Sequence, residues 1–395
     1  MPAEWETVEL REVAELDIER IGVEPDAEYR IAGVLIAGQG LFWRDMITGR
    51  ETNYRTLHRL RARQLVMRKL TAWEGPITTA PLEFDGAYVS SEFPTFTLDQ
   101  SRLLPEYMRL ICQRPEFHAE MRLMSTGTAE RRNRLKPNDL LAIEIALPSL
   151  TEQRQIVEAI TTAETLVEAQ QECVELGYST LKTMQAEVFE NVEADLVPIV
   201  SFTKVVSGGT PATGNPAFWD GDVPFVKTAD VAFRDIHEAG ESITEAGLDS
   251  SSAKLVPAES VLVAMYGRGT VGRSAFLAAP MATNQACAAI LPSDRHSSRF
   301  LFHWLWHSYG DIIELAEGTT NLTNISKGIV EALELPLPDI TQQGELAARL
   351  DDLLDVIRAD ELELRSLDEL RAALLDSLLS GERRLPSSVE QRTTA

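Results

Sequence analysis

The stretch LPSLTEQRQIVEAITTAETLVEAQQECVELGYSTLKTMQAEV, residues 147–188, decides the fold, because a related stretch returns 190 positions later, at residues 337–378. Apolar residues recur in both copies at alternating steps of four and three, a period of 3.5 that is typical of a coiled-coil seam. Both seams carry a polar residue at the fifth position, Gln170 and Asp360. One amphipathic helix is usually part of a core, but two in matching register indicate an internal duplication. The first seam is Ile156, Ile160, Ala163, Val167, Gln170, Val174, Gly177, Leu181, Met184 and Val188, and adding 190 gives the second.

Each copy begins with the same kind of helix start. Residues 147–153 read LPSLTEQ, and residues 337–343 read LPDITQQ. Proline cannot continue a helix, and threonine is a favourable N-cap residue. We therefore expect two long helices that begin at Thr151 and Thr341.

The two helices divide the chain into a first globular unit, a first helix, a second globular unit, and a second helix with a C-terminal tail. Their expected bounds are residues 1–150, 151–195, 196–338 and 339–395. The globular units also match loosely, residues 65–66 with 262–263, and 89–92 with 282–285.

These patterns predict an α+β fold with two pseudo-symmetric globular domains, separated by two long helices that form an antiparallel coiled coil. The termini of compact domains usually lie close together, so we expect the second helix to run back along the first. The 33 residues from position 156 to 188 would span about 50 Å, with one globular unit at each end of the rod.

Length and composition indicate a soluble, cytoplasmic protein of two or three domains. The chain has 395 residues, contains no run of about 18 apolar residues, and its first residues, MPAEWE, do not resemble a signal peptide. We expect no membrane association. The three cysteines are odd in number and far apart, which argues against a disulfide framework or a zinc site.

The net charge of −24 argues at first against nucleic-acid binding, which normally leaves a basic footprint. The charge is, however, sorted along the chain. Segment 1–28 holds ten acidic and two basic side chains, whereas segment 44–69 holds eight basic and two acidic ones. This distribution is compatible with a locally basic face on an acidic protein.

Two short motifs suggest catalysis only weakly. Residues 267–272, GRGTVG, have the glycine spacing of a dinucleotide-binding turn, but the segment after them is short and stopped by Pro280, so a tight turn between strands is favoured. Residues 215–218, NPAF, resemble the NPPF tetrapeptide of adenine methyltransferases but lack its second proline. His303 and His307 are spaced for one helix face, without nearby acidic or cysteine partners in the sequence, and are interpreted as packing residues.

The order of these parts resembles the DNA-specificity subunit of type I restriction–modification enzymes over nearly the whole chain. The resemblance rests on the duplicated helix starts and on several short motifs in this order: Ser207-Gly208-Gly209-Thr210-Pro211, Trp219-Asp220-Gly221-Asp222-Val223-Pro224, Gly269-Thr270-Val271-Gly272, Asn284-Gln285 and Leu378-Leu379-Ser380-Gly381.

This resemblance implies a non-catalytic, cytoplasmic subunit of a system that defends against foreign DNA. Two target-recognition domains would each read half of a split sequence in double-stranded DNA. Two adenine-N6 methyltransferase subunits would dock on the chain, and restriction subunits would be added for cleavage. The chain itself would bind no cofactor, since S-adenosylmethionine belongs to the methyltransferase, and ATP with Mg²⁺ to the restriction subunit.

Polar and basic residues in the loops are the candidates for DNA contact, because base edges are read by polar side chains and phosphates are held by Lys and Arg. Turn formation or surface solvation explains any single one of them about as well. The candidates are Arg131, Arg132, Arg134 and Lys136 in the first domain, and Thr210, Lys227, Arg268, Arg273, Asn324 and Lys327 in the second.

Two other functions remain open from the sequence. A self-contained DNA methyltransferase would use residues 215–218 and 267–272 and would bind S-adenosylmethionine alone. A coiled-coil scaffold that never meets DNA is favoured by the acidic charge, and would lack salt-sensitive DNA binding.

Overall fold

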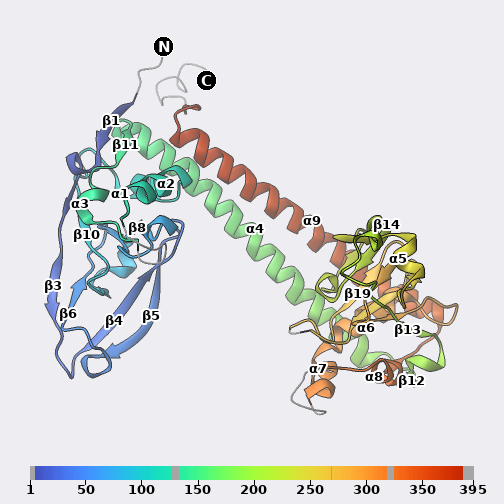
Figure 1. Cartoon of the computed structure of the whole chain (residues 1–395). Coiled ribbons are helices and arrows are strands. Elements are labelled where there is room, and N and C mark those ends of the chain that lie inside the picture. Colours follow the sequence, from blue (N-terminus) through green and yellow to red (C-terminus); the bar gives the residue numbers. More distant parts are fainter. Residues whose placement is uncertain (1–4, 127–132, 268, 318–323, 386–395) are drawn as a thin grey trace, which may run out of the picture. The chain divides into compact units, whose positions relative to one another are not determined.

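The computed structural model describes residues 5–126, 133–267, 269–317 and 324–385, which form two compact units (Figure 1). Unit 1 comprises residues 1–169 and 364–395, and unit 2 comprises residues 170–363. Each unit therefore contains one globular part together with a portion of each long helix.

The described part of unit 1 is built mainly from short strands, with three short α-helices. Its strands are β1 (Glu6–Glu9), β2 (Ala14–Leu16), β3 (Glu19–Gly22), β4 (Glu28–Val34), β5 (Leu41–Thr48), β6 (Thr56–Arg59), β7 (Leu65–Met67), β8 (Ile77–Thr79), β9 (Tyr88–Val89), β10 (Thr95–Leu98) and β11 (Glu144–Leu147). Its short helices are α1 (Pro105–Ile111), α2 (Pro115–Met124) and α3 (Pro137–Leu140). Helices α1 and α2 are separate because Pro115 starts α2 at its first position.

Unit 2 has a similar composition of short strands and helices. Its strands are β12 (Leu196–Pro198), β13 (Val205–Ser207), β14 (Trp219–Val226), β15 (Asp235–Ile236), β16 (Glu241–Ile243), β17 (Leu255–Val256), β18 (Val261–Ala264), β19 (Ser274–Leu277), β20 (Met281–Thr283), β21 (Cys287–Ile290) and β22 (Glu334–Pro336). Its short helices are α5 (Glu245–Asp249), α6 (Ser298–His307), α7 (Tyr309–Glu317) and α8 (Lys327–Ala332).

The two units share one strand topology. The sheet order β2-β10-β7-β8 corresponds to β13-β21-β18-β19, the order β6-β9-β4-β5 to β17-β20-β14-β16, and the pair β1-β11 to β12-β22. In unit 1, β9 pairs in parallel with β4, and in unit 2, β20 pairs in parallel with β14. The other corresponding pairs are antiparallel. Strands β3 and β15 are additions without a counterpart. This shared topology supports the internal duplication inferred from the sequence.

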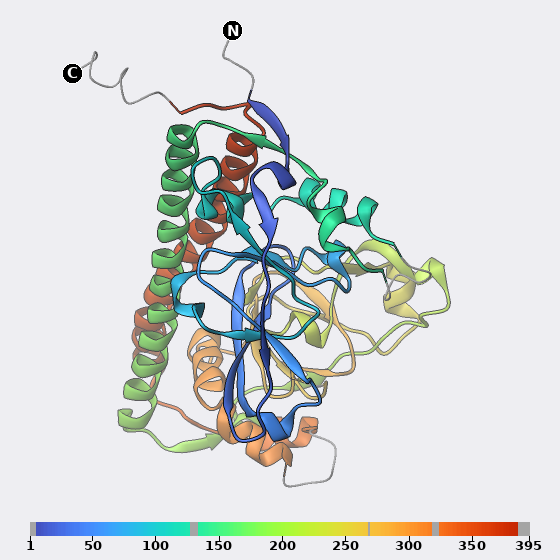
Figure 2. The same cartoon turned by 90° about the vertical axis from the view of Figure 1, so that its left-hand side faces the viewer.

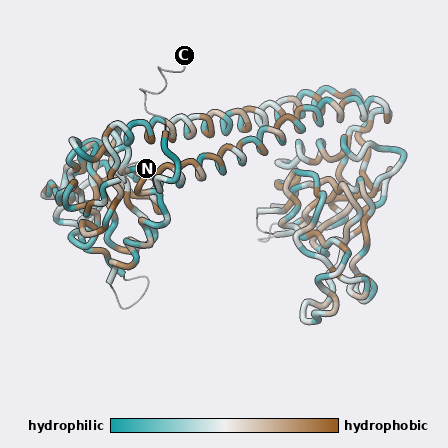
Figure 3. The backbone as a smooth tube through the Cα atoms, turned by 90° about the horizontal axis from the view of Figure 1, so that it is seen from above, coloured by the Kyte–Doolittle hydropathy of each residue, from teal (hydrophilic) through white to brown (hydrophobic). Residues whose placement is uncertain are grey.

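The long helices are α4 (Leu150–Asn191) and α9 (Ile340–Leu379), which lie side by side in Figures 1 and 2. All twenty predicted seam positions are buried or half-buried, and apolar positions recur along both helices in Figure 3. Within unit 2 the helices run antiparallel, since Gln170 donates to the Asp360 carboxylate at 3.1 Å while a Cβ at Gly177 would meet Ile357. The predicted coiled-coil seam and its polar layer are thus confirmed. Within the described residues, no helix has the length and apolar content needed to cross a bilayer.

The predicted starts of the long helices are right, but the predicted capping residue is wrong. Ser149 and Glu152 form a capping box before α4, in which the Ser149 amide donates to the Glu152 carboxylate at 3.1 Å. Before α9, Asp339 accepts from the amides of Thr341 and Gln342, both at 3.0 Å. The capping residues are therefore Ser149 and Asp339, which directly follow Pro148 and Pro338. They precede the predicted threonines by two residues.

A buried glutamine joins each long helix to its globular part. Gln153 is fully buried; its Oε1 accepts from the Leu104 amide at 2.9 Å, and its Nε2 donates to the carbonyls of Arg102 and Pro148. Gln343, 1% exposed, accepts from the Ser297 amide and donates to the Pro338 carbonyl, both at 2.8 Å. The third residue of the repeated Thr-x-Gln sequence thus fixes where each helix leaves its unit.

We expect Gln343→Met to lower the free energy of unfolding by about 2 kcal/mol, because it leaves a buried amide and a buried carbonyl without partners. The matched control is Gln342→Met at the neighbouring exposed position, which should change stability by less than about 0.5 kcal/mol. Chemical denaturation of both variants measures the difference. Equal stability of the two variants would contradict this role for Gln343.

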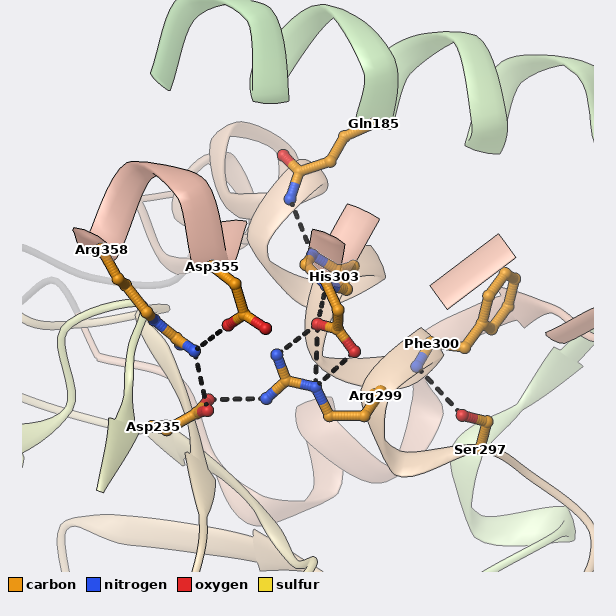
Figure 4. A network of polar contacts seen from close by, with 9 residues as sticks. Gln185, Asp235, Ser297, Arg299, Phe300, His303, Asp355 and Arg358 are labelled. Carbon is orange, nitrogen blue, oxygen red and sulfur yellow. Dashed lines mark hydrogen bonds and ion pairs between the residues drawn. The ribbon is translucent and has the colours of Figure 1, made fainter. Parts of the chain in front are cut away.

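A polar network connects α6, α9, α4 and β15 inside unit 2 (Figure 4). The Arg299 guanidinium contacts the Asp351 carboxylate and, at 2.6 Å, Asp235, which also pairs with Arg358 at 3.0 Å. His303 is fully buried, with Nε2 2.8 Å from Asp351 and Nδ1 3.3 Å from Gln185. Both ring nitrogens therefore take part in hydrogen bonds inside unit 2. His303 is a buried structural residue, in line with its interpretation as a packing residue.

The network fixes the charge states of its members. Burial lowers the pKa of His303, against the raising effect of the Asp351 carboxylate. Burial alone would raise the pKa of Asp351, but hydrogen bonds from His303 and Arg299, and the charge of Arg299, bring it down to about 2. Neutral His303 donates to ionised Asp351 and accepts from Gln185, which satisfies both side chains.

Unit 2 should lose stability as the pH falls from 7 to 5. Below about pH 6.5 the unfolded state takes up the His303 proton more readily than the folded state, so unfolding is favoured by up to about 1.4 kcal/mol per pH unit. Asp351 adds a further loss only as the pH falls from about 4 towards 2. Denaturation midpoints at several pH values measure this slope. His303→Gln should lower stability at pH 7 and flatten the slope between pH 7 and 5, and an unchanged slope would contradict the assignment.

Candidate nucleic-acid interface

In unit 1, three loop segments meet beside the end of β7. The Lys69 amide donates to the Glu92 carbonyl at 2.9 Å, and the Leu135 amide donates to the Lys69 carbonyl at 3.0 Å. The Arg134 backbone exchanges two hydrogen bonds of 3.0 Å with Thr126. This arrangement brings residues 68–70, 90–93 and 133–136 to one place, although they are far apart in the sequence.

The basic residues of these three loop segments differ in their ion pairing. Arg134 Nη1 lies 3.1 Å from Glu92 Oε1, and its side chain is 52% exposed. Arg68 is engaged by Glu74 and by the Leu70 carbonyl. Lys69 and Lys136 form no ion pair with other described residues and are available to an anionic ligand.

A cleft of about 610 Å³ opens next to these residues on the face of β4 and β5. Its lining combines apolar, aromatic and charged side chains, among them Phe42, Tyr54, Arg44, Arg68 and Glu92. Tyr54 is 49% exposed, and the Arg44 guanidinium lies 5.5 Å from the centre of the Phe42 ring. Aromatic faces beside cationic groups suit nucleobases and phosphates.

The basic stretch at residues 44–69 is partly neutralised. Arg50, Arg59 and Arg61 pair with Asp26, Glu19 and Asp17, all of which lie in the acidic segment 1–28. The sorting of charge along the chain therefore reflects pairing between two neighbouring segments of unit 1.

In unit 2, five segments meet around the carboxyl end of β20. Gly209 donates its amide to the Thr283 carbonyl at 2.9 Å, and Thr210 Oγ1 donates to Gln285 Oε1. Tyr266 Oη donates to the Gln285 carbonyl at 2.7 Å. Further backbone contacts add residues 226–227 and 324–325, since the Asn284 amide bonds to the Val226 carbonyl and the Ile325 amide to the Met265 carbonyl.

The two glycines of the Ser-Gly-Gly-Thr-Pro motif are required by close approach. A Cβ at Gly208 would lie 2.0 Å from the Thr283 carbonyl oxygen, and a Cβ at Gly209 would lie 2.2 Å from Ser252 Oγ. Only glycine allows this turn to pack closely against β20, which places Thr210 within hydrogen-bonding distance of Gln285.

The structure brings some of the candidate residues together and gives others a local role. Thr210 and Asn324 lie near the Gln285 loop, and Asn324 is exposed. Lys227 pairs with Glu241, and Lys327 pairs with Glu331 and reaches the Val205 carbonyl at 3.4 Å. Arg273 directly precedes β19 and makes no side-chain ion pair with other described residues. Arg131, Arg132 and Arg268 lie outside the described residues.

Three participants were missed as contact candidates from sequence: Lys69 and Glu92 in unit 1, and Gln285 in unit 2. Glu92 and Gln285 had been matched within the duplication, so comparison of the two copies was the signal that pointed to them. Lys69 lies within the basic stretch, but its backbone contact with Leu135 depends on the fold and could not be read from the sequence.

The two motifs that suggested catalysis have structural roles. The described residues on both sides of position 268 form turns between the antiparallel strands β18 and β19, and three glycines there have positive φ, as expected for a tight turn. Asn215 accepts from the Ala217 amide at 3.2 Å and caps a single helical turn. Among the described residues, no cluster of His, Cys, Asp or Glu could hold a metal ion.

Known sequences match a large part of the chain. Residues 191–369 match the family described as type I restriction modification DNA specificity domain. The HindI specificity subunit of Haemophilus influenzae is 28% identical over 182 residues, which cover 45% of this chain and 39% of that protein. The EcoR124I/EcoR124II specificity subunit of Escherichia coli is 25% identical over 167 residues, 41% of each chain. The chain thus spans about two fifths of the length of these relatives.

Solved structures extend the likeness in fold to nearly the whole chain. A chain from a structure of the assembly and conformational transition of a type I R-M system has a TM-score of 0.64 and 20% identity, covering 96% of this chain and 98% of that one. The HsdS subunit of Thermoanaerobacter tengcongensis has a TM-score of 0.50 and 19% sequence identity, and the match covers 97% of this chain and 98% of that one. The chain is therefore similar to type I restriction–modification DNA specificity subunits, in sequence over residues 191–369 and in fold over nearly its whole length.

Proposed function

We propose that the chain is the DNA-reading subunit of a type I restriction–modification complex and that each globular part reads one half of a split target. The observation that carries this proposal is the shared topology of the two units, in which corresponding strands end beside corresponding polar loops. Two equivalent frames that present different side chains suit two different half-sites.

Within this proposal, base edges are reached by the polar side chains around Arg134 and Gln285. Lys69, Lys136 and Arg273 hold phosphates, because they carry charge that no described acidic residue neutralises. Lys227 and Lys327 contribute less, since each is paired with a glutamate. Arg131, Arg132 and Arg268 stay candidates for phosphate contact on their charge alone.

The partners in this proposal are two adenine-N6 methyltransferase subunits and, for cleavage, restriction subunits. S-adenosylmethionine would then be bound by the methyltransferase and ATP with Mg²⁺ by the restriction subunit. The acidic charge of the whole chain is compatible with this arrangement, because a partner with a basic surface would offset it when the complex meets DNA. A cytoplasmic location is part of the same proposal, because the subunit would act on DNA together with its methyltransferase partners.

Exchange of residues 196–338 for the corresponding segment of a relative should change one half of the methylated sequence and leave the other half unchanged. The reason is that all loops around Gln285 lie within this segment. The measurement is single-molecule sequencing of DNA methylated by the complex. A change in both halves would contradict independent reading by the two domains.

Replacing Lys69 and Lys136 together by alanine should weaken DNA binding by the complete complex and reduce the slope of log affinity against log salt by up to about two. The matched control is Arg50→Ala, which removes a cation that Asp26 already neutralises and should leave the slope nearly unchanged. Binding titrations at several salt concentrations measure both slopes. Complete absence of salt-sensitive binding in the unaltered complex would favour the scaffold function instead.

A further inference from the structure

The two units hold different polar side chains, Glu92 and Gln285, at one pair of corresponding places. Glu92 lies in the connection from β9 to β10, and Gln285 lies in the corresponding connection from β20 to β21. Each side chain is held by a residue from another loop, Glu92 by Arg134 and Gln285 by Thr210. The frame is therefore shared, while the chemistry presented differs.

The pair in unit 1 combines a strong donor with a strong acceptor. One guanidinium nitrogen of Arg134 lies 3.1 Å from Glu92 Oε1, and the other guanidinium nitrogens have no partner among the described residues. Glu92 Oε2 is buried and has no described partner, while the Glu92 side chain as a whole is 30% exposed and lines the cleft on β4 and β5. In the major groove, a G·C pair presents two guanine acceptors, N7 and O6, beside the cytosine N4 donor. Arginine complements the first two and a carboxylate complements the third.

The pair in unit 2 is neutral and offers a different pattern. Gln285 is exposed; its Oε1 accepts from Thr210, retains a second lone pair, and its Nε2 has no partner among the described residues. An A·T pair presents the N7 acceptor and N6 donor of adenine beside the O4 and methyl group of thymine. A glutamine amide complements adenine bidentately, and the Thr210 methyl group can contact the thymine methyl group while its hydroxyl stays bonded to Gln285.

We propose that Glu92 with Arg134 determines a G·C pair in one half of the target, and that Gln285 with Thr210 determines an A·T pair in the other half. The inference rests on the proposed function and adds to it the residues that set specificity. The duplicated frame explains why Glu92 and Gln285 lie at corresponding places, and their different chemistry and different partner loops explain why the half-sites differ.

The test is the methylated motif of the complete complex with Glu92→Gln, Arg134→Ala, Thr210→Val or Gln285→Ala. The first two variants should reduce discrimination about 10- to 100-fold at one G·C position of the half-site that is unaffected by exchange of residues 196–338. The last two should do so at one A·T position of the other half-site. Glu92→Gln and Thr210→Val nearly preserve side-chain shape, so the frame should stay folded.

The control is Lys136→Ala, which removes one positive charge two residues from Arg134 and should weaken methylation of all sites evenly. Where a variant abolishes methylation, competition binding of the same complex to duplexes substituted at each position gives the same readout. Retained discrimination at every position, or an even loss like that of Lys136→Ala, would overturn the assignment. A normal complex without any defined motif would instead reject the proposed function itself.

Discussion

The fold depends on how each long helix is attached to its globular part, and a buried glutamine makes that attachment. Gln153 and Gln343 each bond to a helix-entry carbonyl and to an amide of the neighbouring globular segment. A buried side-chain amide without hydrogen-bond partners destabilises the fold more than an apolar side chain of the same size would. The helix is therefore attached in the one geometry that satisfies the glutamine. The coiled-coil seam can then continue directly into the hydrophobic cores of both units.

Most of the architecture could be predicted from the sequence because it depends on periodicity. A seam of period 3.5 and its return in the second half of the chain identify two helices and a duplication without any knowledge of tertiary contacts. The caps were misplaced by two residues, since Ser149 and Asp339 compete with the threonines as helix starters and local sequence does not decide between them. Sheet order and the division of each helix between two units come from long-range packing, which no local pattern reports.

The candidate interface was harder to predict because charge in a sequence does not reveal its partners. Residues 44–69 are strongly basic, yet three of their arginines are neutralised by acidic side chains of the segment 1–28. Glu92 and Gln285, in contrast, were matched between the two copies, but the residues that hold their side chains, Arg134 and Thr210, come from other loops and depend on the fold. Exposed polar residues become candidates only when the fold shows which of them retain unused donors and acceptors.

The difference between what the two copies kept and what they changed follows from the cost of each change. Gln153 and Gln343 stayed identical because each satisfies several buried backbone groups, and any replacement would destabilise a whole unit. Arg134 and Asn324 stand immediately before equivalent backbone hydrogen bonds, yet neither side chain is buried, so they can differ without disturbing the sheet. Surface substitutions of this kind usually alter stability by only about 0.5 kcal/mol. A duplicated frame can therefore acquire two different half-site specificities while its folding remains governed by the same buried contacts.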